Sequence, residues 1–420
     1  MKILLLTQWY YPEPGPHVHE LAEELVSRGH GVTVLTGFPT YPSDRFYEGY
    51  RPRLFLREEC GGVKIVRVPH FAHGKGSAVL RVLNYCSFMF SAMTIGNALI
   101  GKADCMYVFL PPPLLGLAAK VISFFHRISL MYDIQDIWPD AIEASSFSCS
   151  KVFKRAISLI ASFVYPFAKA ISVPSAGYRR NLISKGVEGD RIEVIPNWAD
   201  EHIFRPLPYD ATMARQYGLE GAFTVVFAGN LGHAQSLETI LDAAELLRDK
   251  PDIRFLLAGD GAALESLRVR CGRSGLTNVI FAGRLPVEDM PLLFSVADLL
   301  VVHLREHRAF RMTIPRKTQE YMACGKPILM GVGGDAAELI NETRAGVTCR
   351  PELPAEMAEA ILQVYQLSPE QRRVIGNNAR KAYERLFQKR DVVGQYERLL
   401  YRVAGIEACR RSEVSQCGEL

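Results

Sequence analysis

The chain has 420 residues, which is long for a single hydrophobic core and predicts two domains. It is 48% hydrophobic and 22% charged with a net charge of +4, a composition typical of a soluble globular protein and not of a nucleic-acid binder. The cysteines form no CxxC pair, so we expect reduced, cytoplasmic usage and no zinc site.

The charge is unevenly distributed along the chain. Residues 51–187 carry 17 Lys+Arg against 7 Asp+Glu, a surplus of ten positive charges. A basic surface confined to one domain could face anionic lipid or a phosphorylated acceptor. An ordinary solvated basic face explains the same surplus equally well.

The first half of the chain alternates apolar runs of strand length with longer helical patterns. KILLLTQWY follows Met1 without a signal-peptide cleavage region, so we interpret it as a buried strand. The spacing of apolar residues predicts a helix over 18–29, ended by Gly29. Further strands are expected at 31–37, 63–69, 103–110 and 128–134, with a helix at 114–126 before the last of them.

Two apolar segments could contact a membrane. Val82 to Gly101 carries no charge, but polar residues spaced by three and four form a stripe on one helix face, which favours a buried or interfacial amphipathic helix over a membrane span. Ala156 to Ala168 is flanked by basic residues and is too short to span a bilayer. A membrane-surface role for both segments is a hypothesis.

The pattern restarts after two more strands, at 170–175 and 192–197. The polar, proline-containing stretch 197–208 is typical of a linker, and strands are then expected at 223–230, 253–261, 278–285, 299–304 and 327–333. We therefore predict an α/β protein with two Rossmann-like, doubly wound domains, at 1–198 and 199–390, facing across a cleft. A last helix within 391–405 is expected to cross back to the first domain, and 406–420 to form a frayed tail.

Glycines follow two strands of the second domain. Gly229, Asn230 and Gly232 lie between a strand and a helix, where a backbone can approach a phosphate. Gly259 and Gly261 repeat the arrangement, but neither a complete GxGxxG nor a Walker lysine is present, which disfavours a dinucleotide dehydrogenase or a P-loop enzyme. Tight turns account for such glycines as often as phosphates do.

The first domain offers candidates after two of its strands. Gly15 sits in a proline-rich loop, and His17 and His19 follow at the start of a helix; two residues apart, they would diverge, so we predict no metal site there. Asp133 and Asp136 stand at the end of a strand, where carboxylates point into the cleft of this fold class. A turn or a helix cap is the alternative for either aspartate.

The stretch MTIPRKTQEYMACGKPIL, residues 312–329, places charges at the start of a helix that Pro315 can begin. Backbone donors near Thr313 and Ile314, with the charge of Lys317, suit a diphosphate. The two oxygens of Glu320 suit a pair of ribose hydroxyls. A surface helix with a Lys–Glu pair accounts for the spacing equally well.

Taken together, these motifs resemble the family 4 glycosyltransferases of the GT-B fold. The resemblance covers nearly the whole chain, through YYPEPG, GHGVTVLTGFPTYP, DIQDIWPD, IEVIPNWADEHIF, VVFAGNLGHAQSLETILDAAELL, FLLAGDG and IPRKTQEYMACGKPIL. Their order and intervals are similar to those of the bacterial branch that builds surface polysaccharides. The resemblance implies transfer of a sugar from a nucleotide sugar with retention of configuration, without a metal or other cofactor.

The resemblance also implies roles for individual residues. It assigns Glu320 to the ribose, Arg284 to the surroundings of the base, and Asp136 to the acceptor or the sugar. The donor-binding residues expected on this basis are Gly229, Asn230, Gly232, Gln235, Gly259, Gly261, Arg284, Thr313, Ile314, Lys317, Thr318 and Glu320. The catalytic residues expected are Gly15, where the donor phosphate could approach closely, His17 and Asp136.

Two positions depart from the family pattern. Met312 stands eight residues before Glu320, where the family often has a second glutamate, and Gln135 stands where many members have a histidine before the aspartate. Glutamine can position a hydroxyl but cannot act as a base. A donor phosphate oxygen could take the acceptor proton instead, so activity is compatible with these departures. They bear on the identity of the sugar and on whether the family's catalytic assignments carry over directly to this chain.

The expected function is therefore a cytoplasmic glycosyltransferase, peripheral on the inner face of the membrane, that prefers a UDP-sugar over a GDP-sugar and acts on a lipid-linked or oligosaccharide acceptor. Two alternatives stay open from sequence. One is a non-hydrolysing nucleotide-sugar 2-epimerase, which shares the two-domain architecture. The other is a non-catalytic nucleotide-sugar-binding partner of a polysaccharide complex, which the departures at Met312 and Gln135 would suit.

Overall fold

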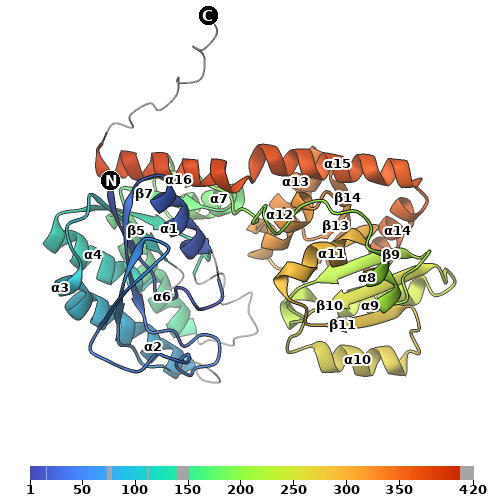
Figure 1. Cartoon of the computed structure of the whole chain (residues 1–420), viewed down its shortest axis with the longest axis horizontal. Coiled ribbons are helices and arrows are strands. Elements are labelled where there is room, and N and C mark those ends of the chain that lie inside the picture. The colour runs from blue at the N-terminus through green and yellow to red at the C-terminus, as the bar shows by residue number, and fades with distance from the viewer. Residues whose placement is uncertain (16, 73–77, 111–112, 139, 141–150, 407–420) are drawn as a thin grey trace, which may run out of the picture.

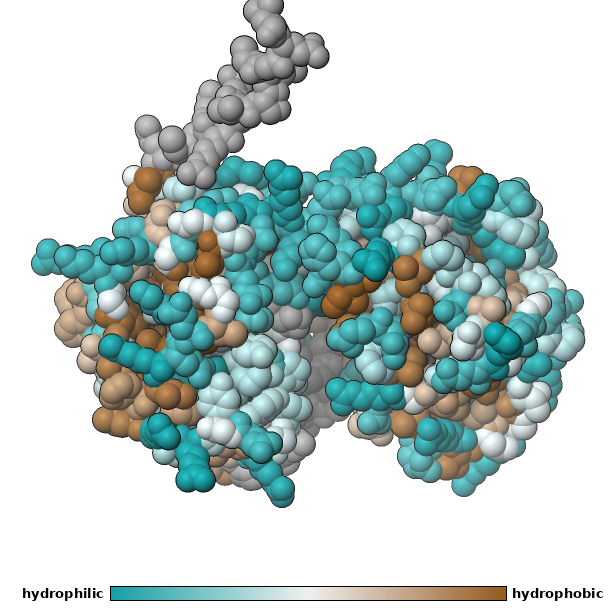
Figure 2. All heavy atoms as spheres, viewed as in Figure 1, coloured by the Kyte–Doolittle hydropathy of each residue, from teal (hydrophilic) through white to brown (hydrophobic). Residues whose placement is uncertain are grey.

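The structure, a computed structural model, describes residues 1–406 except 16, 73–77, 111–112, 139 and 141–150. It shows two α/β domains side by side, joined along one edge by the helices at the carboxyl end of the described chain (Figure 1). A notch separates the two lobes on the opposite side (Figure 2). The expected fold class is confirmed. Most of the expected tail, residues 407–420, lies outside the described residues.

The first domain is built on a sheet with the strand order β3-β4-β2-β1-β5-β6-β7-β8 among the described residues. All neighbouring strands are parallel except β3 and β4, which are antiparallel. The strands are β1 (Lys2–Leu6), β2 (Gly31–Gly37), β3 (Leu56–Cys60), β4 (Val63–Val68), β5 (Cys105–Phe109), β6 (Ser129–Asp133), β7 (Ala170–Val173) and β8 (Ile192–Val194).

Helices cover both faces of this sheet. Apolar side chains of α2, α4, α6 and α7 form one core with the sheet, whereas α1 and a helix from the far end of the chain, α16, form the core on the other face. The helices and helical turns between β1 and β8 are α1 (His17–Ser27), α2 (Ala78–Ser91), η1 (Ala92–Gly96), α3 (Asn97–Leu99), α4 (Leu115–His126), α6 (Lys151–Val164), η2 (Tyr165–Phe167), α7 (Ala176–Ser184) and η3 (Gly189–Arg191).

The second domain has an all-parallel sheet with the order β11-β10-β9-β12-β13-β14 among the described residues. Its strands are β9 (Phe223–Ala228), β10 (Ile253–Ala258), β11 (Val279–Gly283), β12 (Leu299–His303), β13 (Ile328–Gly331) and β14 (Gly346–Thr348). Its helices and helical turns are α8 (Ala211–Gln216), η4 (His233–Gln235), α9 (Glu238–Leu246), α10 (Leu264–Arg273), η5 (Val287–Asp289), α11 (Met290–Ser295), η6 (Phe310–Met312), α12 (Arg316–Ala323), α13 (Asp335–Thr343), α14 (Pro354–Tyr365) and α15 (Pro369–Leu386).

The chain crosses between the domains twice. Trp198 lies in a core of the first domain, and Ala199 lies in a core of the second. On the return, α15 packs in the second domain, and α16 (Lys389–Ala404) lies along the first. Both helices run along one edge of the molecule, in red in Figure 1.

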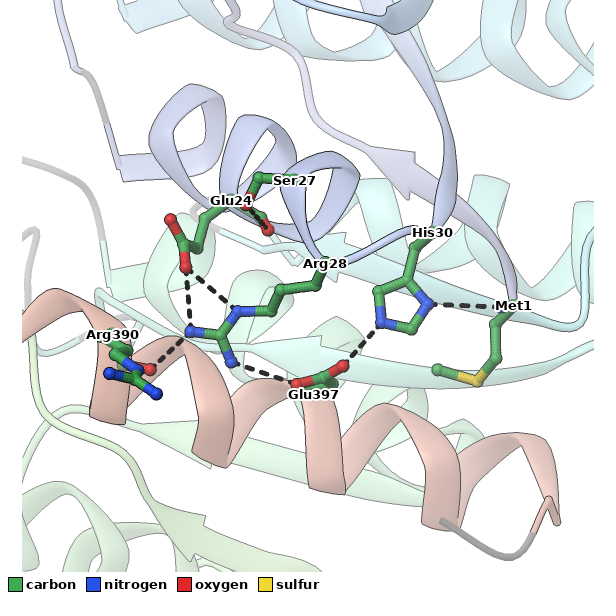
Figure 3. A network of polar contacts seen from close by, with 7 residues as sticks. All are labelled: Met1, Glu24, Ser27, Arg28, His30, Arg390 and Glu397. Carbon is green, nitrogen blue, oxygen red and sulfur yellow. Dashed lines mark hydrogen bonds and ion pairs between the residues drawn. The ribbon is translucent and has the colours of Figure 1, made fainter. Parts of the chain in front are cut away.

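A polar network fastens α16 to the first domain (Figure 3). Glu397 accepts a hydrogen bond from Arg28 at 3.0 Å, and its other oxygen lies 2.7 Å from His30 Nε2. Arg28 also donates to Glu24 and to the backbone carbonyl of Arg390. The helix is thus held by polar groups at its rim as well as by the apolar core beneath it.

Two expectations about the elements need correction. Strand β3 was not expected, because its sequence, LREEC, lacks an apolar run; it pairs as an antiparallel edge strand. The helix expected over 82–101 is present but begins earlier, ends at Leu99 and contains a π-helical turn: α2, η1 and α3 follow one another without a gap. At the π-helical turn, Gly96 lies so close to strand β2 that an added Cβ would come within 2.8 Å of the Leu35 side chain.

Candidate functional site

The two candidate loops follow strands at equivalent places in the two sheets. Strand β1 lies between β2 and β5, and β9 lies between β10 and β12, so each marks the point where the strand order reverses. Ligands of open α/β sheets bind outside the carboxyl ends of strands at such points. The loop with Gly15 follows β1, and the loop with Gly229 follows β9.

A cavity of 620 Å³ opens at the carboxyl end of β9. Three of the predicted donor residues, Gly229, Arg284 and Glu320, line it together. Its other lining residues are mainly apolar: Phe204, Ala228, Leu285, Pro286, Val287, Met290 and Phe294. An apolar wall with a few convergent polar groups is typical of a small-molecule site.

Glu320 and Lys317 lie on α12 beside this cavity. Burial raises the pKa of the Glu320 carboxyl, while Arg316 and Lys317 act in the opposite direction. The Lys317 ammonium is buried, and burial lowers its pKa to about 7. It has no hydrogen-bond partner among the described residues and lies 3.7 Å from the centre of the Phe227 ring. A buried cation without a partner is costly, so this site favours an anion.

Gly229 gives the Lys317 ammonium access to this loop. The backbone there has φ +134°, and an added Cβ would lie 3.0 Å from Lys317 Nζ. Gly259 and Gly261 lie behind the loop: a Cβ at 259 would collide with the carbonyl oxygen of Gly229 at 1.8 Å. These two glycines therefore let adjacent loops pack closely, and direct donor contact by either stays a prediction.

The remaining donor candidates divide by exposure and by existing partners. Asn230 is exposed, while the Gln235 side chain already accepts a hydrogen bond from the backbone of Gly232. Thr313 and Ile314 are half-buried at the start of α12. Thr318 has no exposed surface, so the structure does not bring it to the wall of the cavity.

Asp133, which ends strand β6, is the hub of a buried network in the first domain. It accepts hydrogen bonds from the hydroxyls of Tyr107 at 2.6 Å, Ser172 at 2.8 Å and Tyr396 of α16 at 3.2 Å, and from the amide of Gln135. Burial opposes ionisation of this carboxyl, but the interaction with His17 and these hydrogen bonds outweigh it and lower its pKa. Asp133 is thus a fully satisfied structural anion.

Of the three predicted catalytic residues, His17 lies against this network. His17 stacks on Trp198 with ring centres 4.2 Å apart, and its Nε2 lies 3.5 Å from Asp133. Gly15 is exposed, with φ +120° and no atom within 4 Å of an added Cβ. Asp136 is exposed at the carboxyl edge of the sheet, although nearby protein removes enough water to raise its pKa. Their catalytic roles stay predictions.

An aromatic cluster near Asp136 was not expected from sequence. The ring of Trp9 lies 5.9 Å from Tyr41 and 6.0 Å from Tyr85, and Tyr85 lies 6.2 Å from Trp138. Asp136 acts electrostatically on the Tyr85 hydroxyl and is among the groups that raise its pKa, after burial. The faces of such rings can pack against the apolar face of a sugar. No periodicity links these residues, because three follow different strands and Tyr85 lies on α2.

The domains contact each other through α7 and the segment before α12. Ser175 donates to the backbone carbonyl of Met312, and Asp335 accepts from the backbone of Gly177 at 2.5 Å. A Cβ at 177 would lie 2.9 Å from the Cβ of Met312. Met312 therefore packs against the first domain, which is a use for this position that the sequence pattern did not indicate.

A second contact between domains passes through Arg316. Its guanidinium lies 3.5 Å from Glu320 on the same helix and 3.7 Å from Glu20 of α1. Glu20 in turn accepts a hydrogen bond from the indole of Trp198. Arg316 thus bridges two carboxylates on opposite sides of the domain boundary, one of which lines the cavity.

No group of three or more His, Cys, Asp or Glu side chains within the described residues is arranged to hold a metal ion. The positive charge nearest the start of α12 comes instead from Lys317 and Arg316. The dipole of α12 adds positive potential at the same end of the helix. The cavity can accordingly hold an anionic ligand with an apolar ring at one end.

The chain is similar in sequence to known glycosyltransferases. A family model described as "Glycosyl transferase 4-like domain" matches residues 13–198, and one described as "Glycosyl transferases group 1" matches residues 222–367. A protein of Escherichia coli named for colanic acid biosynthesis, the glycosyl transferase WcaI, is 26% identical over 411 residues, which cover 94% of this chain and 98% of the relative. WbjE of Pseudomonas aeruginosa, named as a glycosyltransferase, is 26% identical over 285 residues, covering 67% and 70%.

Solved structures share the fold. The crystal structure of Anabaena HepE in complex with UDP and glucose has a TM-score of 0.71 at 20% identity, covering 95% of this chain and 99% of that chain. WaaG, titled a glycosyltransferase involved in lipopolysaccharide biosynthesis, has a TM-score of 0.66 at 15% identity, covering 96% and 100%. With two facing α/β domains, a cavity beside Glu320 and two family models that together span most of its length, the chain belongs to the family 4 glycosyltransferases of the GT-B fold.

Proposed function

We propose that this enzyme transfers a sugar from a UDP-sugar to a lipid-linked glycan acceptor during synthesis of a bacterial surface polysaccharide. The observation that carries the proposal is the cavity beside Glu320, together with the Lys317 ammonium at the start of the same helix, which has no hydrogen-bond partner among the described residues. We assign Glu320 to the ribose and Lys317 to the diphosphate of one nucleotide. The names of WcaI and WaaG, which refer to colanic acid and lipopolysaccharide biosynthesis, support the choice of pathway.

The lining of the cavity supports a uracil base. Guanine presents two adjacent groups of hydrogen-bond donors, which a buried carboxylate would best satisfy. Glu320 is the one carboxylate among the described lining residues, and we assign it to the ribose. Uracil needs fewer side-chain partners, since backbone groups of the loop from Arg284 to Val287 can meet its amide-like edge.

The chemistry we propose is transfer with retention of configuration, without a catalytic metal, of a hexosyl or N-acetylhexosaminyl group. The bond between the anomeric carbon and the diphosphate breaks, and the leaving oxygens gain negative charge. Lys317 and the amide hydrogens at the start of α12 can stabilise that charge. The acceptor hydroxyl attacks from the same face and gives its proton to the departing phosphate oxygen, so that a protein base at position 135 is not required.

The acceptor is proposed to bind on the first domain. The aromatic cluster around Tyr85 offers flat apolar surfaces for a sugar ring, and Asp136 stands beside it as a hydrogen-bond acceptor. A lipid-linked acceptor would place the enzyme on the inner face of the cytoplasmic membrane, in accord with the basic surplus in residues 51–187.

Calorimetric binding of UDP, GDP and ADP tests the donor site. We expect UDP to bind with the highest affinity, and Glu320→Ala to weaken it by about 1–3 kcal/mol, the scale of lost hydrogen bonds to a charged group. Glu359→Ala, an exposed carboxylate on α14, is the matched control and should leave binding unchanged. Folded protein that binds none of the three nucleotides would remove the main support for the proposal.

NMR of the products tests the reaction itself. A UDP-sugar with an acceptor glycan should give a product with the anomeric configuration of the donor. Donor incubated alone should keep its sugar stereochemistry. A change at C2 without acceptor would identify an epimerase, and an inverted product would rule out the proposed mechanism.

A further inference from the structure

The helices on one face of the first sheet share an unusual composition. α2, η1, α3, α4 and α6 contain no aspartate or glutamate, whereas they carry Arg81, Lys120, Lys151, Lys154 and Arg155. On the opposite face, α1 carries glutamates and no lysine or arginine, and α16 carries both acidic and basic residues. The helices α2, η1, α3, α4 and α6 therefore supply five of the ten surplus positive charges of residues 51–187.

The same helices expose large apolar side chains. Val152 is 79% exposed, Phe124 74% and Phe163 62%, although each lies on a helix whose inner side belongs to the core. On α6 the exposed apolar positions fall at intervals that place them on one side of the helix. We call the following set the docking face: Val79, Leu83, Phe90, Phe124, Phe125, Val152, Leu159 and Phe163, with the cations Lys120, Lys151 and Arg155.

Contacts link the parts of this face. The Phe163 and Phe167 rings lie 4.9 Å apart, and the Lys120 ammonium lies 4.6 Å from the centre of the Phe167 ring. At the end of α4, the Nε2 atom of the His126 ring lies 3.0 Å from the backbone carbonyl oxygen of Asn97, the first residue of α3. Apolar colours gather in Figure 2 over the part of the first domain where Figure 1 places α2, α3 and α4.

A shallow hollow at the edge of this face adds further cations. It is lined by Phe124 and Phe167 together with Arg127, Lys169 and Arg191. Phenylalanines beside basic side chains match the boundary between lipid tails and anionic head groups. Within the hollow, Arg191 pairs with Glu188 and Lys169 donates to the backbone carbonyl of Val403, so an anionic surface would be met mainly by Arg127 and the cations of the docking face.

The stretch Val79–Leu99 is, within the described residues, the one helical segment long and apolar enough to cross a membrane by length and composition. Its packing argues for a position at the surface of a bilayer. Phe88, Met89 and Ala92 lie in the core of the first domain. The polar side chains of this segment also make hydrogen bonds within the protein. Asn84 accepts one from the side chain of Gln8 at 2.5 Å, and Ser87 accepts one from the backbone amide of Phe71. A span would break these contacts.

We propose that the docking face rests flat on an anionic lipid bilayer, with its phenylalanines in the head-group boundary and its cations against lipid phosphates. This inference rests on the proposed lipid-linked acceptor and identifies how the enzyme meets it. Helix α2 then connects the docking face with the proposed acceptor site. Its outer side carries Leu83 and Phe90 of the docking face, and its Tyr85 belongs to the aromatic cluster at the proposed acceptor site. A lipid anchor in the bilayer and its glycan near Tyr85 would lie on either side of one helix.

Flotation with vesicles tests the proposal without using activity. The probes are vesicles of pure phosphatidylcholine and vesicles with roughly three parts phosphatidylglycerol to seven of phosphatidylcholine, an anionic surface. The wild type should float with the anionic vesicles, less at high salt, and little with the neutral ones. Lys120→Gln with Arg155→Gln should weaken partitioning about fivefold for each cation removed. Phe124→Ser with Phe163→Ser should weaken it by about tenfold for each ring.

Matched controls keep the result interpretable. Leu246→Ser with Val269→Ser removes exposed apolar side chains from helices of the second domain and should leave flotation unchanged. UDP binding, measured in every variant, confirms folding and stays separate from membrane binding. UDP binding without flotation overturns the docking face alone, and flotation without nucleotide binding contradicts only the proposed function. Equal flotation with neutral vesicles, or equal loss in the control variant, would also overturn the inference.

Discussion

Two buried charges near the carboxyl edges of the sheets, Asp133 in the first domain and Lys317 in the second, have opposite surroundings. Asp133 accepts hydrogen bonds from three hydroxyls and one amide, and it holds α16 in place through Tyr396. Lys317 has no such partner among the described residues and rests over an aromatic ring. A satisfied buried charge supports the fold, whereas an unsatisfied one destabilises the empty protein until an anion binds.

The largest effect is expected at Lys317. Lys317→Met should lower turnover by about 10²–10³-fold, the effect of losing one group that stabilises developing charge. Because the ammonium has no hydrogen-bond partner among the described residues and methionine can keep an apolar contact with the Phe227 ring, the variant should be at least as resistant to thermal unfolding as the wild type. Initial rates and thermal scans measure the two properties. A variant that unfolds more readily would show that Lys317 belongs to the fold, and Lys250→Met, at the surface, is the control.

At Asp133 the pattern should be reversed. Asp133→Asn should lower the free energy of unfolding by about 3 kcal/mol, since it disturbs a buried charge with several partners. The pKa of Asp133 is lowered in the folded protein, so its stabilisation is present above the unfolded value of about 3.9 and is lost as the pH falls below it. Urea unfolding at neutral and at acidic pH should show a difference from wild type that shrinks in acid.

Donor affinity should be hardly affected by the same substitution. UDP should bind Asp133→Asn as it binds the wild type, because the carboxylate lies in the first domain and outside the donor cavity. A folded Asp133→Asn protein with strongly weakened UDP binding would contradict the division of roles between the two charges.

The pH dependence of donor binding gives the next effect. The pKa of Lys317 is about 7 in the empty protein, so the amine is mostly neutral at pH 8. A bound diphosphate favours the charged form, so binding should take up close to one proton, and Kd should rise about tenfold for each pH unit above 7. Calorimetry of a UDP-sugar in buffers of different ionisation enthalpy measures this uptake. Lys317→Met should abolish it; uptake that persists in this variant would assign the proton elsewhere.

The smallest effect is expected at the bridge between the domains. Arg316 is partly exposed and lies 3.5 Å and 3.7 Å from its two carboxylates, so Arg316→Met should change UDP affinity by less than about 1 kcal/mol. A double-mutant cycle with Glu20→Gln measures whether the two residues act together. A coupling energy well above this range would make the bridge part of the donor site.

The sequence predicts most of the fold because buried parallel strands are continuous apolar runs. β1, β5, β9 and β10 are of this kind. The sequence pattern does not predict β14, because this strand has only three residues and none of them is fully buried. The π-helical turn η1 lies against Leu35, a residue far away in the sequence that no local pattern includes.

The site could be predicted in part for a similar reason. The charges of Lys317 and Glu320 stand out locally between two prolines, so a ligand could be considered from the sequence alone. Asp133 and Asp136 looked alike at the end of one strand. Their different environments depend on distant groups, among them Tyr396, which follows Asp133 by 263 residues. Met312 meets its neighbours across the domain boundary, where sequence spacing carries no information.

The crossing of α16 also has a consequence for synthesis. A ribosome completes β1 to β8 long before it reaches residues 392–403, whose side chains fill one core of the first domain. Until then a nascent first domain exposes the apolar face that α16 later covers and leaves Asp133 without Tyr396. The second domain can form its own core earlier, so the domain that begins first is finished last. Chains interrupted before α16 should accordingly be prone to aggregation and proteolysis.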